Sequence, residues 1–143
     1  MKTYFDHEKL DVYQEAIAFC GWVGEFISAI SAKAAAKDQL DRASTSISLN
    51  VAEGNGKFSD KDRARFLEMA RGSALECAAC LDVLLVRKLA GDEQVVPAKN
   101  QLAKIVQILI GILRKFSERA SVLREEEPAY SIDHDYEHEQ EQE

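Results

Sequence analysis

Apolar residues recur at helical spacing along most of the chain. The first such segment is predicted to begin near Asp6, a good N-cap residue, and to continue through the alanine-rich run AKAAAK to about Lys37. Its apolar positions lie three and four residues apart, as on one face of an α-helix. They are Leu10, Tyr13, Ile17 and Cys20, widened by Ala16, Val23, Phe26, Ile27 and Ile30.

Two further helices are predicted on either side of the turn signal Asn55-Gly56. The second spans residues 38–54, with Gly54 in the left-handed position that closes many helices. Ser59 is the predicted N-cap of the third helix, which ends at Gly91. Its apolar positions are Phe66, Leu67, Ala70, Ala74, Cys77, Ala78, Leu81, Leu84 and Leu85.

A fourth helix is predicted with Pro97 in its first turn. Its apolar residues alternate at spacings of four and three, as in a coiled-coil seam. They are Leu102, Val106, Leu109, Leu113, Phe116, Ala120 and Leu123. A second stripe of Ile105, Ile108 and Ile112 indicates either a wide core face or a subunit interface. The sequence therefore predicts an all-α, up-and-down four-helix bundle over residues 5–124.

The charge of the chain is divided unevenly. The 143 residues carry a formal charge of −7, but residues 125–143 hold nine acids and no Lys or Arg. Residues 1–124 are therefore slightly basic, at +2. We interpret residues 125–143 as an acidic, disordered tail. The acidic total does not exclude a nucleic-acid partner for the bundle.

The same composition limits the compartment. No apolar run is long enough to span a membrane, and the first residues lack the apolar segment of a secretory signal. Three cysteines, an odd number, are typical of reduced thiols rather than a disulfide framework. We therefore expect a cytoplasmic protein with no membrane partner.

A line of polar residues follows one narrow arc of the second helix beside its apolar face. Its members are Arg42, Ser46, Asn50 and Glu53. Polar groups this close to a core are costly unless they satisfy one another. The line is either a structural network, joined by Arg71 and Glu76 of the third helix, or a site for a ligand or nucleic acid.

Basic residues gather around the second turn and the third helix. The candidate nucleic-acid contacts are Lys57, Lys61, Arg63, Arg65 and Arg71. Asp60, Asp62 and Glu68 dilute them, so an ordinary solvated helix face is the alternative. No aromatic-rich RNA-binding signature accompanies the basic residues, so nothing supports base-specific recognition.

Catalytic and metal-binding patterns are missing from the sequence. Cys77-Ala-Ala-Cys80 is half of a zinc motif without a second pair, and small core residues explain it more simply. Neither the Glu-x-x-His pairs of a di-iron bundle nor a phosphate-binding loop occurs. We predict no enzymatic activity, no metal and no cofactor.

Two segments resemble the family of 23S rRNA intervening-sequence proteins, also labelled S23 ribosomal proteins. They are residues 39–54 and 58–76, and the opening LDVYQEA of residues 10–16 is similar to the family's start. The matching positions are Gln39, Arg42, Ala43, Ser46, Ile47, Asn50, Ala52, Glu53, Gly54, Arg65, Phe66, Leu67, Ala70, Gly72, Ser73 and Glu76. The chain departs from the family where AKAAAK replaces its usual Pro and Glu between the first two helices, and in the acidic tail.

The resemblance implies a ring-like homo-oligomeric bundle, pentameric in relatives and without known catalysis. It also places Gln39, Arg42, Ser46, Asn50, Glu53 and Glu76 in one structural polar network. A related branch binds a reverse transcriptase and nucleic acid through a strongly basic surface. At +2 the present bundle is only marginally basic, so the main family is the better match.

Two functions remain open at this point. The first is a non-enzymatic module that binds RNA or a ribonucleoprotein. The alternative is a protein–protein interaction scaffold that uses the apolar stripes or the acidic tail. In the first case the tail is a candidate internal brake, since it would compete with RNA for the basic residues.

Overall fold

The computed structural model describes the backbone of residues 2–126 and the side chains of residues 2–119. A short 3-10 turn, η1 (Asp6–Lys9), precedes four helices: α1 (Asp11–Ala29), α2 (Ala35–Gly56), α3 (Asp60–Val86) and α4 (Asp92–Glu126). This described part of the chain contains no strand. The helix α4 continues two residues past the predicted boundary at 124. The rest of the predicted tail lies outside the described residues.

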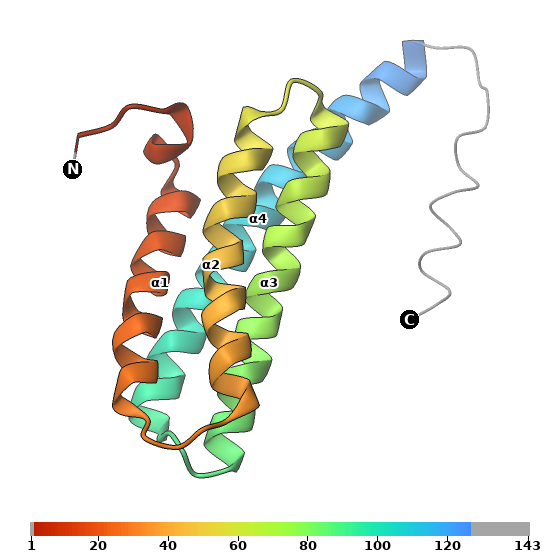
Figure 1. Ribbon diagram of the computed structural model, residues 1–143. Coiled ribbons are helices and arrows are strands. Elements are labelled where there is room, and N and C mark those ends of the chain that lie inside the picture. Colours follow the sequence, from red (N-terminus) through yellow and green to blue (C-terminus); the bar gives the residue numbers. More distant parts are fainter. Residues whose placement is uncertain (1, 127–143) are drawn as a thin grey trace.

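The four helices run up and down, and each packs against the next (Figure 1). The contact between α2 and α3 is the most extensive, and α4 returns to close the bundle against α1. The predicted four-helix architecture is therefore confirmed. Within residues 2–126, no helix has the length and apolar character needed to cross a membrane.

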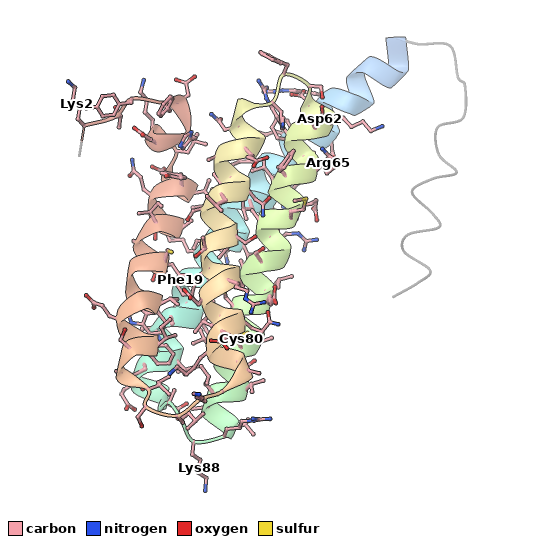
Figure 2. The ribbon with its side chains drawn as sticks, viewed as in Figure 1. Lys2, Phe19, Asp62, Arg65, Cys80 and Lys88 are labelled. Atoms are coloured by element: carbon pink, nitrogen blue, oxygen red, sulfur yellow. The ribbon has the colours of Figure 1, made fainter. Side chains whose placement is uncertain are left out.

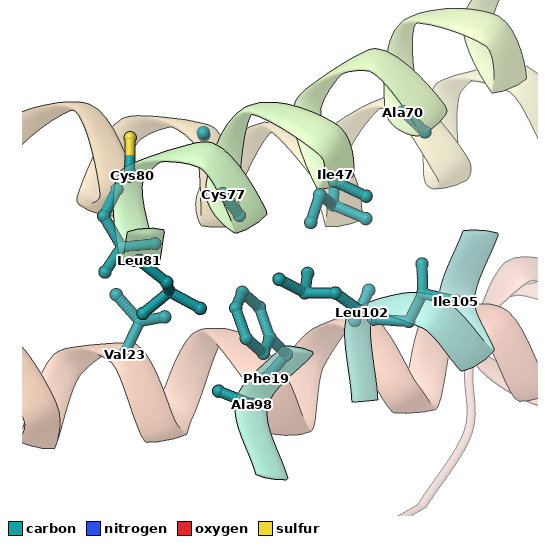
Figure 3. Packing of buried hydrophobic residues seen from close by; sticks show 14 of the residues in the cluster. Phe19, Val23, Ile47, Ala70, Cys77, Cys80, Leu81, Ala98, Leu102 and Ile105 are labelled. Carbon is teal, nitrogen blue, oxygen red and sulfur yellow. The ribbon is translucent and has the colours of Figure 1, made fainter. Parts of the chain in front are cut away.

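Apolar side chains from all four helices fill the centre of the bundle (Figure 3). Phe19 of α1, Ile47 of α2, Leu81 of α3 and Ile105 of α4 are each fully buried there. Burial of large apolar side chains is the main free-energy gain of folding. The isoleucine stripe of α4 belongs largely to this core, because its other members Ile108 and Ile112 pack half-buried against it.

The core face of α1 agrees with the predicted one only in part. Its buried residues are Val12, Ala16, Phe19, Val23 and Phe26. Ala16, Val23 and Phe26 belong to the predicted set, whereas Val12 and Phe19 do not. The rest of the predicted stripe runs along the flank, where Ile17 is 40% exposed. Both stripes follow helical spacing, so only the positions of α2 and α4 decide which one points inward.

The first reversal of the chain comes earlier than predicted. The first α-helix begins at Asp11 rather than near Asp6 and ends at Ala29 rather than near Lys37, so only the second half of the run AKAAAK belongs to α2. Ile30 is extended and buried, and Lys37 Nζ donates to the carbonyl oxygens of Ile30 and Ala32, 2.5 and 3.2 Å away. Alanine favours helix on either side of a turn, so propensity could not locate it.

Gly54 does not close α2, which continues to Gly56. Gly54 is helical and buried, and a Cβ built on it would lie 3.0 Å from Phe66 Cβ and 3.3 Å from the Arg63 carbonyl oxygen. No glycine of the described chain has a positive φ. Gly54 is therefore required by the close approach of α3, not by a left-handed turn.

The turn between α3 and α4 also differs from its prediction. The helix α3 ends at Val86, and Lys88 adopts the left-handed conformation with φ 62°. Gly91 precedes α4 and its N–H donates to Gln94 Oε1 at 3.2 Å. Pro97 consequently lies inside α4 rather than in its first turn.

Candidate nucleic-acid interface

The turn between α2 and α3 is held by hydrogen bonds from both sides. Ser59 Oγ accepts from the N–H of Asp62 at 3.2 Å, which confirms Ser59 as the N-cap of α3. Arg63 Nε donates to the carbonyl oxygen of Lys57 at 2.7 Å and so covers the end of α2. Asp60 Oδ1 lies 3.4 Å from Arg63 and 3.5 Å from Arg119 of α4. The turn is thereby tied to three helices.

Two basic side chains beside this turn meet over one aromatic ring. Lys57 Nζ lies 4.9 Å from the centroid of the Phe66 ring, and Arg65 Cζ lies 5.0 Å from it. The negative face of an aromatic ring attracts cations at this distance. Neither cation forms an ion pair with a carboxylate among residues 2–119.

The five predicted basic contacts separate into three groups. Lys57, Lys61 and Arg65 surround the turn, and Lys61 and Arg65 share the outer face of α3 by their four-residue spacing. Arg63 is half-buried and stabilises the turn itself. Arg71 lies about two helical turns from Arg65 and pairs with Glu68, 2.9 Å between Nη2 and Oε2. Figure 2 labels Arg65 at the end of the bundle that carries the turn.

Sequence reasoning missed two residues of this end. Arg119 reaches Asp60 from α4 across 59 positions of sequence, a contact that only the tertiary fold creates. Phe58 is fully exposed, at 100%. The sequence places Phe58 directly before the cap Ser59, but only the structure shows that its ring is exposed. We call Lys57, Phe58, Lys61 and Arg65 the basic turn.

A hydrogen-bonded network joins α2 to α3, smaller than the predicted one. Asn50 Nδ2 donates to Ser46 Oγ at 2.9 Å and to the Ser46 carbonyl oxygen at 3.0 Å. Ser73 of α3 donates its hydroxyl to Ser46 Oγ, also at 2.9 Å. These three side chains are half-buried at the outer seam between the two helices.

The remaining predicted members of the network are exposed: Gln39, Arg42, Glu53 and Glu76. Within the described chain, no side-chain hydrogen bond joins them to Ser46, Asn50 or Ser73. They share the arc of the network members but lie at its solvent side, so they need no partner to offset burial. They border the seam without closing the network.

Cys77 and Cys80 belong to the hydrophobic core. Cys77 is fully buried, and this burial raises the pKa of its thiol to about 12, with neighbouring Cys80 adding to the effect. Burial likewise raises the pKa of Cys80. Among the described residues, no group of three His, Cys, Asp or Glu side chains is arranged to hold a metal ion.

Known proteins of similar sequence or structure are found in two comparisons. The family model of the 23S rRNA-intervening sequence protein matches residues 8–111. A protein of unknown function of the S23 ribosomal protein family from Bacteroides thetaiotaomicron VPI-5482 has a similar solved structure, with a TM-score of 0.67. The two chains are 24% identical, and the match covers 71% of this chain and 97% of that one. No curated protein matches. Because the family model spans most of the bundle, the chain belongs to the 23S rRNA-intervening sequence protein family.

Proposed function

We propose that the protein is a non-enzymatic module that binds RNA or a ribonucleoprotein through the basic turn. The observation that carries this proposal is the set of cations Lys57, Lys61 and Arg65, which converge on one end of the bundle. None of the three has a carboxylate partner in residues 2–119. Phosphate groups are the natural counter-charge for such a set. The family description, which refers to 23S rRNA, agrees with this partner class.

A few cations give weak affinity, and self-association would multiply it. We propose a ring-like homo-oligomer, which presents several basic turns together. Exposed apolar residues on three neighbouring helices support a subunit contact: Ile17 of α1, Leu49 of α2 and Met69 of α3, exposed by 40%, 60% and 47%.

The register of the bundle places these three apolar residues at one level. Cys20 Sγ of α1 lies 4.0 Å from Thr45 Oγ1 of α2. Because these two helices are antiparallel, Ile17 and Leu49 each lie about one helical turn from that pair towards the same end of the bundle. Ser73 contacts Ser46, so Met69, one turn from Ser73, also reaches the level of Leu49. An apolar band across three helices is typical of a surface that a partner covers.

The RNA proposal is tested by reversing charges at the basic turn. The double variant Lys61→Glu, Arg65→Glu should lose retention of a labelled 23S rRNA transcript, and the remaining binding should depend less steeply on salt concentration. Arg71→Glu is the matched control, because it reverses one charge on the same helix away from the turn. Its binding should remain close to that of the unaltered protein.

Equal retention by the double variant and the unaltered protein would contradict the basic turn as the contact. No retention by the unaltered protein would contradict RNA binding altogether. In that case the apolar band of Ile17, Leu49 and Met69 favours the second candidate function, a scaffold that binds another protein.

A further inference from the structure

The ring of Phe58 makes the basic turn different from an ordinary basic patch. Phe58 is 100% exposed, whereas the neighbouring Phe66 is half-buried under two cations. The backbone around Phe58 is fixed, because Arg63 holds the Lys57 carbonyl oxygen and Ser59 caps α3. A large apolar side chain is therefore held in solvent on a well-tied turn, with both of its faces free.

The charges beside this ring select a polyanion as its partner. Lys57 directly precedes Phe58, and Lys61 follows it three residues later on the first turn of α3. Asp60 and Asp62 flank Lys61 in the sequence, and Asp60 is already shared by Arg63 and Arg119. A partner that offers negative charges beside a flat ring satisfies both features at once.

We propose that the basic turn binds single-stranded nucleic acid, with one base stacked on Phe58 and the flanking phosphates contacted by Lys57, Lys61 and Arg65. This inference rests on the RNA-binding function proposed above and specifies its ligand. An aromatic ring stacks on an unpaired base, whose face is open, whereas the base faces of a duplex are covered by their neighbours. One ring among several cations is the arrangement that binds strands with little sequence preference.

The test separates the contribution of the bases from that of the phosphates. Binding of a labelled single-stranded oligoadenylate is compared with binding of an abasic strand of equal length and with the oligo(A)·oligo(U) duplex. The unaltered protein should prefer the strand with bases about tenfold over the abasic strand, within the range of one stacked base. Phe58→Ala should lose this preference and bind the abasic strand as the unaltered protein does. Phe58→Trp should restore it.

Val86→Ala is the matched control, since Val86 is also a strongly exposed apolar residue, 79% exposed, on the last turn of α3 at the opposite end of the bundle. Because the Phe58 ring is fully exposed, its removal should leave the thermal midpoint and the sedimentation coefficient unchanged.

Four results would overturn the inference. Phe58→Ala could retain the preference for bases, or the duplex could bind as tightly as the single strand. In either case the proposed RNA binding through the cations would stand without base stacking. A lower sedimentation coefficient for Phe58→Ala would assign the ring to a subunit contact. If the unaltered protein bound none of the three probes, the proposed function would fail together with this inference.

Discussion

At the scale of single residues, the absence of a side chain at Gly54 allows α2 and α3 to approach closely. A methyl group at this position would meet Phe66 Cβ and a backbone carbonyl, and neither can rotate away. Gly72, by contrast, lies on the exposed side of α3 with nothing within 4 Å of its added Cβ. The two glycines look alike in the sequence, and only packing distinguishes them.

We expect Gly54→Ala to lower the free energy of unfolding by about 1 kcal/mol or more, since the cost of overpacking exceeds the gain in helix propensity. Gly72→Ala should raise it by up to about 1 kcal/mol, because only the propensity changes. Urea unfolding of both variants measures the difference. Equal stability of the two would contradict the close approach.

The buried thiol of Cys77 makes the free energy of unfolding depend on pH. Its pKa is raised to about 12 in the folded protein from an ordinary value of 9.0, so the unfolded chain releases this proton first. As the pH rises from about 9 towards 12, deprotonation of Cys77 favours the unfolded state over the folded one. The free energy of unfolding therefore falls.

The variant Cys77→Ala should therefore be less stable near neutral pH, because it leaves a cavity, yet its stability should fall less steeply in alkali. Urea unfolding at about pH 8 and at about pH 10.5 gives the two slopes, and the other titrating groups contribute equally to both proteins. Parallel slopes would show that the Cys77 thiol does not contribute.

At the scale of elements, the seam between α2 and α3 is polar on its outer side. Ser46 accepts from both Asn50 and Ser73, so one hydroxyl fixes the register of two helices. A register error of one turn would leave these groups without partners.

We expect Asn50→Ala to lower the free energy of unfolding by about 1 kcal/mol, the usual net worth of a hydrogen bond. Glu53→Ala should change it by less than about 0.5 kcal/mol, because Glu53 is exposed and has no partner in the described network. Thermal unfolding of the pair checks this. A larger loss for Glu53→Ala would assign it a contact in the assembled protein.

The elements themselves were predictable from the sequence and their ends were not. Helical spacing predicted four helices, and a serine before α3 predicted its cap, because these signals are local. The ends of α1 and α2 depend on where Ile30 can enter the core and where α3 presses against Gly54. Likewise the sequence located Lys57, Lys61 and Arg65, whereas the neighbourhood of Arg119 exists only in the folded bundle.

At the scale of the whole molecule, the apolar band across α1, α2 and α3 is the feature that a single bundle leaves uncovered. If the band is a subunit contact, a charge at its centre should separate the subunits. We expect Leu49→Asp to sediment as a monomer, whereas Val86→Asp, at a distant exposed position, should sediment as the unaltered protein does. An oligomer that survives Leu49→Asp would place the contact elsewhere.

Four antiparallel helices also bring the start of α1, the α2–α3 turn and the end of α4 to one end of the bundle (Figure 1). The turn that holds Lys88 lies at the other end, about 40 Å away along the 27 residues of α3 (Figure 2). A bulky group attached at the start of α1 or at the end of α4 would therefore lie at the same end of the bundle as the basic turn. A fluorophore at position 88 would stand clear of that turn and serve as a fixed reference for measuring how a labelled strand is oriented.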